Sequence, residues 1–367
     1  MKTVRLASLV CLIIAMLLQA CAAGAPAQAP PTQTPHLVPT SLPSAPPATS
    51  TPSGDLSPDA IASLRSLQQV DEYPLYTMKY VGEYVFGAQS TQSRSEAVLS
   101  VAPQSLFSPT SWGCSLFAAL GDGSERLYGR NFDWDFSPAL LLFTNPPDGY
   151  DSVSMVDIAY LGFAGSDAQG LTELPLEALQ RLLESPAWPF DGMNSQGLAI
   201  GMAAVPDGNM RPDPDKPSVD SLSIIREVLD HAADVKQAIE IFERYNIEMG
   251  GGPPLHYLVA DVTGEAALIE FYQGEMRILP NEAPYHLATN FLLSATEAPA
   301  GQCWRYDALQ ETLTDKQGGL SAVQAVELLS SVAQDSTQWS IVYDMTSLEV
   351  SVIPGQQYEQ VYSFSLR

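Results

Sequence analysis

The sequence has few basic residues. It contains 17 lysines and arginines against 42 aspartates and glutamates, a formal net charge of −25 over 367 residues. A chain this acidic is repelled by nucleic-acid phosphates and by anionic lipid surfaces. We therefore do not expect the protein to bind a polynucleotide.

Cysteine is also scarce. The chain has four: Cys11, Cys21, Cys114 and Cys303. Two lie in or at the end of an apolar leader, so Cys114 and Cys303 remain for the folded part, too few for a disulfide framework. A single disulfide between these two stays open as an alternative, and it would disable any thiol chemistry at Cys114.

No hydrophobic run is long enough to span a bilayer comfortably. The N-terminal run LASLVCLIIAMLL follows the basic start MKTVR and leads into LQAC, which ends at Cys21. This pattern predicts a signal peptide over 1–20. LQAC resembles the lipobox of bacterial lipoproteins, which implies cleavage before Cys21, lipid on its sulfur and an extracytoplasmic, membrane-anchored protein. The alternative is an ordinary signal peptide that ends near a cysteine.

The rest of the chain divides by composition. Residues 21–54 are rich in proline, serine, threonine and alanine, which predicts an extended tether. Ordered sequence follows, with a short helix from Ser57 and one or two strands over 74–88. From residue 114 onward, hairpin patterns and helical patterns stand in separate blocks, with two successive amphipathic helices over 218–246. Such blocks favour an α+β fold over alternating βαβ units.

The common hydrolase and metal motifs are missing. The chain has no G-x-S-x-G, no H-E-x-x-H and no P-loop. Its histidines are His36, His231, His256 and His286. None is near Cys114 in the sequence, so a Cys–His dyad would need distant segments and is kept only as an alternative. The aspartates of PDPDKPSVD lack the glycine turn and distal glutamate of a calcium loop and favour a solvated acidic loop.

Cys114 begins an apolar run that the turn GDGS separates from ERLYGRNFDW. A hairpin centred on this turn predicts that Cys114 faces Asn131, with Arg130 and Asp133 within two positions. Arg130 and Asp133 differ in parity, so a regular ladder places them on opposite faces. Both side chains can contact Cys114 only if a β-bulge or the end of the strand changes the direction of one of them.

This hairpin has two interpretations. A guanidinium near Cys114 would lower the pKa of its thiol, and a carboxylate could accept a hydrogen bond from an ammonium group. Equally, Arg130 and Asp133 could form a structural ion pair beside a buried cysteine. A nucleophile would need a base, and the α-amine of Cys114 would serve if the chain were cut after Gly113, because its pKa lies near neutrality. Glycine is the least obstructive residue for the N→S acyl shift that such a cut requires.

Several motifs from Cys114 to the C-terminus carry a family resemblance. GCSLFAA, GRNFDW, DGMN with a Gly-Leu strand, ATN and WRY occur in this order. Together they resemble the choloylglycine hydrolase family of N-terminal nucleophile hydrolases, with penicillin V acylase, bile salt hydrolase, acid ceramidase and N-acylethanolamine acid amidase. The resemblance implies a four-layer αββα sandwich over 114–367, two stacked antiparallel sheets covered by helices. It also implies that 55–113 is a pro-segment or small subunit, cut from the rest of the chain by autocleavage at Gly113–Cys114.

The resemblance also implies roles for single residues. Cys114 matches the nucleophile, and its freed α-amine matches the base. Arg130 and Asp133 match the residues that hold the thiolate and the amine. Asn290 in ATN matches the side-chain donor of the oxyanion hole, and Arg305 in WRY matches the arginine that completes the charge network of the site.

The second oxyanion donor implied by the resemblance is the backbone N–H of Ala204, where relatives can carry asparagine. Asn194 in DGMN is interpreted as a turn former. The implied reaction is hydrolysis of a linear, non-peptide amide in a small N-acyl substrate, without a cofactor or metal. An acyltransferase with the same acyl-enzyme, and an inactive surface binding lipoprotein on this fold, are the alternatives.

Overall fold

The structure is a computed structural model that describes residues 56–84, 113–250 and 252–367. The chain divides into two units, Met1–Leu56 and Ser57–Arg367. Every helix and strand named below belongs to the second unit.

Several predictions concern residues outside the described ranges. These are the signal peptide over 1–20, lipid attachment at Cys21, the tether over 21–54 and residues 85–112 of the segment before Cys114. Within the described ranges, no helix combines the length and the apolar composition that a membrane crossing requires.

Two large sheets form the core of the second unit. The nine-stranded sheet comprises, in spatial order, β1 (Gln68–Asp71), β2 (Leu75–Lys79), β5 (Ala139–Thr144), β6 (Ser152–Asp157), β7 (Asp191–Asn194), β8 (Leu198–Ala204), β11 (Leu255–Asp261), β12 (Ala266–Tyr272) and β13 (Glu275–Pro280). The six-stranded sheet comprises β14 (Tyr285–Ala288), β3 (Gly113–Ala119), β4 (Leu127–Asp133), β15 (Thr337–Asp344), β16 (Glu349–Pro354) and β17 (Tyr362–Ser365). Neighbouring strands are antiparallel except β2 and β5, which are parallel.

The inner faces of these sheets pack directly on each other. Strands β3 and β8 read GCSLFAA and LAIGMAA, and every residue in them is buried. Such continuous apolar runs are typical of strands covered on both faces. A Cβ atom on Gly201 of β8 would lie 2.8 Å from the Tyr128 hydroxyl of β4, so the sheets approach closely there. The same hydroxyl donates to the Leu258 carbonyl of β11 at 3.0 Å and links the sheets.

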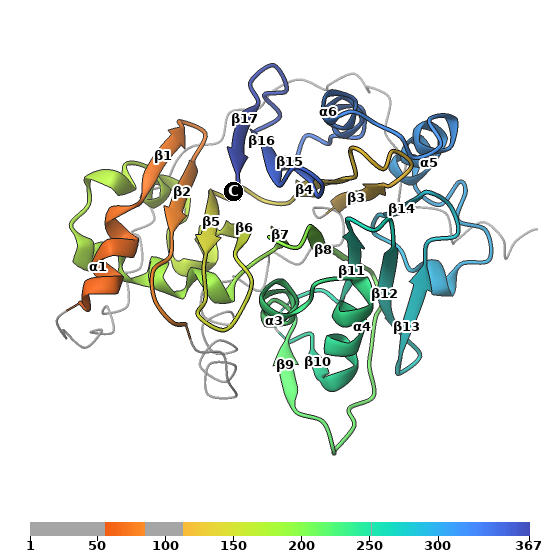
Figure 1. Cartoon of the computed structure of the whole chain (residues 1–367), viewed down its shortest axis with the longest axis horizontal. Helices are drawn as coiled ribbons and strands as arrows, with labels where there is room; N and C mark the ends of the chain where they lie inside the picture. Colours follow the sequence, from red (N-terminus) through yellow and green to blue (C-terminus); the bar gives the residue numbers. More distant parts are fainter. Residues whose placement is uncertain (1–55, 85–112, 251) are drawn as a thin grey trace, which may run out of the picture. The chain divides into compact units, whose positions relative to one another are not determined.

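Helices cover both outer faces, so the fold is α+β with four layers, as predicted (Figure 1). Leu229 and Phe242 pack α3 and α4 into the core of the nine-stranded sheet. Leu309 and Leu329 pack α5 and α6 with buried residues of the six-stranded sheet. The α-helices are α1 (Pro58–Arg65), α3 (Ser223–His231), α4 (Val235–Arg244), α5 (Trp304–Asp315) and α6 (Ala322–Ser331).

Local sequence explains where these helices begin. The helix predicted from Ser57 is α1: Ser57 caps it by accepting a hydrogen bond from the Ala60 N–H at 3.1 Å, and Pro58 occupies the first helical position. Asp234 caps α4 in the same way, through the Gln237 N–H at 2.8 Å. The caps satisfy backbone donors that have no partner inside the helix.

Shorter elements complete the unit. The first of the two helices predicted over 218–246 begins later than expected, because β9 (Ser218–Asp220) pairs in parallel with β10 (Asn246–Glu248). The 3₁₀ helices are η1 (Ile158–Leu161), η2 (Gly165–Ala168), η3 (Leu171–Glu173), η4 (Leu176–Ala187) and η5 (Leu293–Ala295).

Two strands that precede Cys114, β1 and β2, are part of the nine-stranded sheet. Strand β2 lies within the predicted strand region and pairs with β5 over five residues. Leu75, Tyr76 and Met78 are fully buried there, and the Tyr76 hydroxyl donates to the Ala168 carbonyl at 2.8 Å. Residues 57–84 therefore contribute two strands and part of the core of the same unit as the residues after Cys114.

Candidate active site

Cys114 is the second residue of β3 and is 3% exposed. It pairs with Phe132 of β4, so the predicted pairing with Asn131 is wrong by one residue, and Ser115 occupies that register. The connection between the strands runs from Leu120 to Arg126, which has an odd number of residues. The hairpin is therefore centred on Gly123 and not on the middle of GDGS.

The register places Arg130 and Asp133 on opposite faces, as their parity predicted. Arg130 is opposite Leu116 and shares the inner face with Cys114, whereas Asp133 is opposite Gly113. The guanidinium Nη2 of Arg130 lies 3.7 Å from the Cys114 Sγ. The Asp133 carboxylate lies instead near Arg305, which holds the Cys114 backbone. Asp133 is the last residue of β4, where the register of its pairing with β15 shifts.

The thiol lies beside a buried ion pair. Arg130 pairs with Asp191, both are fully buried, and the Tyr343 hydroxyl donates to the Asp191 carboxylate at 2.5 Å. Burial lowers the pKa of Arg130, but the Asp191 carboxylate raises it above its ordinary value, so the guanidinium stays charged. Sequence reasoning missed Asp191, although it begins the motif DGMN, which forms the fully buried strand β7.

Burial controls the protonation of the thiol. It raises the pKa of Cys114, Arg130 opposes this effect, and the Asp133 carboxylate adds to it, so the pKa ends above the ordinary value of a thiol. In the uncut chain, Cys114 is therefore a neutral thiol at neutral pH.

The backbone of Cys114 is held by two side chains. Its N–H donates to the Asn290 Oδ1 at 2.7 Å, and its carbonyl accepts from the Arg305 guanidinium. Arg305 also donates to the same Asn290 oxygen at 2.8 Å and to the Ser115 hydroxyl at 3.0 Å. Two residues that are distant in the sequence thus meet at the backbone of Cys114 in β3.

Asp133 lies on this same side. Its Oδ2 accepts from the Gln334 Nε2 at 2.6 Å, its Oδ1 accepts from the Thr337 hydroxyl at 2.5 Å, and Arg305 is 3.7 Å away. Burial raises the pKa of Asp133, and Arg305 and the two hydrogen bonds oppose this effect. A Cβ atom on Gly113 would lie 2.3 Å from the Gln334 Nε2. Sequence reasoning missed Gln334 and Thr337, because no motif marks the segment between α6 and β15.

Asn290 also reaches Ala204, so the structure brings together the residues nominated for the oxyanion hole. The Asn290 Nδ2 donates to the Ala204 carbonyl at 2.7 Å, and this contact joins the ends of the two sheets. A carboxamide nitrogen carries two hydrogens, so one remains for another acceptor. The predicted donor at Ala204 is its N–H, and the contact in the structure uses its carbonyl.

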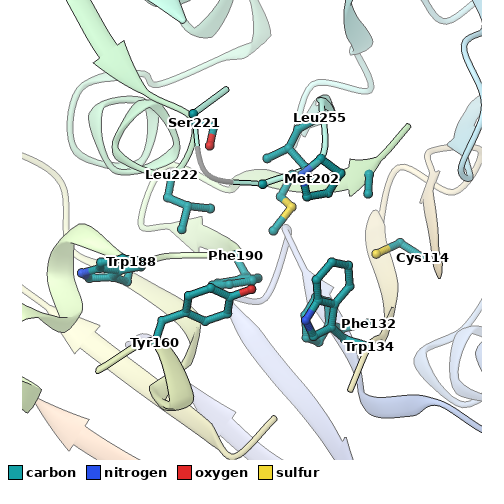
Figure 2. Close-up of a pocket in the computed structure, with 14 residues that line it drawn as sticks. Cys114, Phe132, Trp134, Tyr160, Trp188, Phe190, Met202, Ser221, Leu222 and Leu255 are labelled. Carbon is teal, nitrogen blue, oxygen red and sulfur yellow. The ribbon is translucent and has the colours of Figure 1, made fainter. Parts of the chain in front are cut away.

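A pocket that is open to solvent extends from the Cys114 sulfur. Figure 2 shows Cys114 at one end and Trp188 at the other, with aromatic rings between them. Phe132 and Phe190 meet edge to face at 5.3 Å, and Tyr160 stacks on Trp188 at 5.8 Å. No lining side chain is charged; the lining residues are Cys114, Phe132, Trp134, Tyr160, Trp188, Phe190, Met202, Ala204, Ser221, Leu222, Gly250, Gly252, Pro253 and Leu255.

The histidines do not support a Cys–His dyad. His256 contacts Glu270 at 3.2 Å, and His286 contacts the Leu279 carbonyl at 2.9 Å. His231 ends α3, and His36 lies outside the described residues.

Cys114 and Cys303 are both free thiols, so a disulfide between them is not formed in this structure. The sulfur of Cys114 therefore remains available for chemistry. In the described part of the chain, no group of three or more histidine, cysteine, aspartate or glutamate side chains could hold a metal ion.

Asn194 forms a turn, as predicted. Its Oδ1 accepts from the Gln196 and Leu198 N–H groups at 3.1 and 3.2 Å. Its Nδ2 donates to the Leu229 and Ala232 carbonyls of the α3 region at 3.0 and 2.7 Å. These contacts use the whole carboxamide for local structure and leave none of it for Cys114.

Comparison with known proteins finds one family model and several solved structures that are similar to this chain. Residues 114–291 match the family model described as linear amide C–N hydrolases, choloylglycine hydrolase family. An arginine-to-leucine variant of conjugated bile acid hydrolase from Clostridium perfringens is similar in structure, with a TM-score of 0.50 and 12% identity over 69% of this chain and 92% of that chain. Penicillin V acylase from Agrobacterium tumefaciens aligns with a TM-score of 0.47 and 15% identity over 69% of this chain and 86% of that chain. A search of curated proteins finds no match.

Proposed function

We propose that the chain is a hydrolase of linear amide C–N bonds, the class of the family model that residues 114–291 match, and that Cys114 becomes its N-terminal nucleophile. One observation carries this proposal. The nitrogen, the carbonyl and the sulfur of Cys114 each have their own polar partner: Asn290, Arg305 and Arg130. A cysteine that only filled the core would need no partner for its sulfur.

Autocleavage would create the base. The Cys114 sulfur attacks the Gly113 carbonyl carbon, the C–N bond of that peptide breaks, and the nitrogen takes the thiol proton. Water then hydrolyses the thioester and leaves a carboxylate on Gly113 and a free amine on Cys114. The absence of a Cβ at Gly113 supports this step, because any side chain there would collide with Gln334.

The freed amine suits the chemistry that follows. An α-amine titrates near neutral pH, so it can accept the thiol proton that burial otherwise retains on Cys114. The Asn290 Oδ1 lies 2.7 Å from this nitrogen and would orient the amine toward its own sulfur. Arg130, 3.7 Å from the sulfur, would stabilise the thiolate.

The reaction with substrate would then proceed in two steps. The thiolate attacks the acyl carbonyl carbon, and the carbonyl oxygen takes the negative charge. The second Nδ2 hydrogen of Asn290 and the N–H of Ala204 would stabilise that oxyanion. The amine group of Cys114 protonates the leaving nitrogen, and water then attacks the acyl-enzyme, which releases the acid and restores the thiol.

The pocket supports one class of acyl group. Its walls are aromatic and aliphatic and carry no charge, so an anionic group would lose its hydration there without compensation. We infer that the acyl part is uncharged and apolar, and that it extends from Cys114 toward Trp188.

The N-terminal region supports a lipid-anchored, extracytoplasmic enzyme. On this proposal, lipid on Cys21 belongs to the fragment that ends at Gly113. Buried contacts of β2 with β5, and the Tyr84 hydroxyl, 3.0 Å from the Asp230 carboxylate, would keep that fragment attached after the cut.

Intact-mass analysis tests the proposal. Purified wild-type protein should give two fragments that separate between Gly113 and Cys114, and it should hydrolyse N-acyl amides with apolar acyl groups. Cys114→Ala should remain uncut and inactive, and Cys114→Ser should cut slowly. An uncut and fully active wild type would overturn the α-amine mechanism.

A further inference from the structure

Two ionisable residues are buried next to the segment that carries Asn290. His256 of β11 and Glu270 of β12 lie across from each other on neighbouring strands and are 1% and 0% exposed. The His256 Nδ1 lies 3.2 Å from the Glu270 Oε1. The other His256 nitrogen has no hydrogen-bond partner among the described residues, so the Glu270 carboxylate is the polar contact of this side chain.

The Glu270 carboxylate extends beyond its own sheet. Its Oε1 accepts from the Leu293 N–H and its Oε2 accepts from the Ser294 N–H, each at 2.8 Å. These N–H groups are at the start of η5, which is the next element after β14, and Asn290 lies in the short connection between the two. With one backbone N–H on each oxygen, the carboxylate fixes both the position and the rotation of the turn.

The position of this turn determines the position of the Asn290 side chain. The chain leaves the six-stranded sheet at the end of β14, passes Asn290 and is next held at Leu293 and Ser294. Asn290 must reach the Cys114 nitrogen in one sheet and the Ala204 carbonyl in the other, both at 2.7 Å. A shift of about 1 Å in such a group can cost a hundredfold in rate.

We propose that Glu270, oriented by His256, is a positioning residue that holds the turn over 290–294 so that Asn290 can stabilise the oxyanion. Glu270 does not touch Cys114 or the pocket and acts only through Asn290. The inference rests on the proposed role of Asn290. Burial raises the pKa of Glu270, but the contact with His256 and the hydrogen bond from Ser294 lower it by more. The pKa is therefore below its ordinary value, and the carboxylate stays ionised and able to accept both N–H groups.

A double-mutant cycle tests the proposal. Glu270→Ala should lower kcat about ten- to hundredfold and leave KM within twofold, because the pocket is unchanged. Glu270→Gln retains one acceptor oxygen and should recover part of the loss. In an Asn290→Ala background, Glu270→Ala should change kcat less than twofold, because its effect passes through Asn290.

Asp261 provides the matched control. It is a fully buried carboxylate at the other end of β11, and it accepts the Val235 N–H at 2.8 Å, at the start of α4. Asp261→Ala should lower the stability of the fold, measured by urea unfolding. It should leave kcat per folded molecule unchanged in both backgrounds.

The outcomes separate two failures. Wild-type kcat in Glu270→Ala, or an equal loss with and without Asn290, would overturn the positioning role. Wild-type turnover in Asn290→Ala alone would instead overturn the proposed oxyanion hole.

Discussion

The two sides of Cys114 are built differently. The thiol side consists of the Cys114 sulfur, Arg130, Asp191 and the aromatic pocket. The main-chain side consists of the nitrogen and carbonyl of Cys114 with Asp133, Asn290 and Arg305. On the thiol side, one cation lies 3.7 Å from the sulfur and is itself paired with Asp191. On the main-chain side, hydrogen bonds hold both backbone groups of the same residue.

This difference indicates where the catalytic geometry must be strict. The Cys114 sulfur lies in an apolar wall and needs few hydrogen bonds to orient it, because its reactivity depends on nearby charge and on burial. On the proposed mechanism, the backbone nitrogen of Cys114 becomes an amine and must stay oriented toward that sulfur after the cut. The denser set of hydrogen bonds on the main-chain side fits this requirement.

The largest effect is expected from breaking the thiol side at Asp191. Asp191→Ala leaves the Arg130 charge buried without its partner and should cost about 3–5 kcal/mol in unfolding free energy. The same change lets the Arg130 charge act more strongly on the thiol, so the pKa of Cys114 should fall. Urea unfolding measures the first effect, and peptide-resolved alkylation across pH measures the second.

Asp191→Asn is the matched variant. It removes the charge but keeps an oxygen that can accept from Arg130, so its loss of stability should be smaller than that of alanine. A thiol pKa that stays the same in both variants would show that Asp191 does not control the charge acting on the sulfur.

Breaking the main-chain side at Asn290 should affect turnover more than folding. Asn290→Ala removes one proposed oxyanion donor and should lower kcat about a hundredfold or more. Asn194→Ala is the comparison, because its carboxamide also bonds backbone groups but lies outside the site. That variant should lose stability and keep kcat per folded molecule. Near-wild-type kcat in Asn290→Ala would remove Asn290 from the site.

Sequence reasoning went further on the fold than on the site. Apolar runs such as those around Leu116 and Ile200 predict buried strands, and their grouping predicts α+β. The register at Cys114 depended on a connection longer than the GDGS turn, which local turn chemistry does not specify. Tertiary packing alone brings three further residues to the site: Asp191, Gln334 and Thr337. The sequence next to Cys114 therefore does not predict them.

The pocket wall on the thiol side should make stability depend on pH. Asp157 is buried at the start of η1, which carries the lining residue Tyr160, and burial raises its pKa to about 7. A pKa higher in the folded than in the unfolded state means that the folded state binds the proton more tightly. The resulting stability is complete below about pH 4 and is lost as pH rises through about 7.

Between pH 5 and pH 8, Asp157 should therefore account for a loss of roughly 2–3 kcal/mol in unfolding free energy. Asp157→Asn keeps an acceptor for the Ala159 N–H, held now at 2.9 Å, and removes the titration. Urea unfolding at both pH values should show a smaller decline in the variant. The same decline in both proteins would contradict the raised pKa.

The smallest effect is expected at Gly113, which precedes the proposed cleavage point on the main-chain side. A methyl group there would lie 2.3 Å from the Gln334 Nε2, the movable end of a side chain that also donates to Asp133 at 2.6 Å. In an uncut Cys114→Ala background, Gly113→Ala should displace that amide and cost about 1 kcal/mol, the value of one hydrogen bond. Once Gln334→Ala has removed the side chain, the same methyl group should cost less, because that collision and the hydrogen bond are gone and the nearest remaining atom is the Asp133 Oδ2 at 3.2 Å. An equal cost with and without Gln334 would show that the contact does not select glycine at this position.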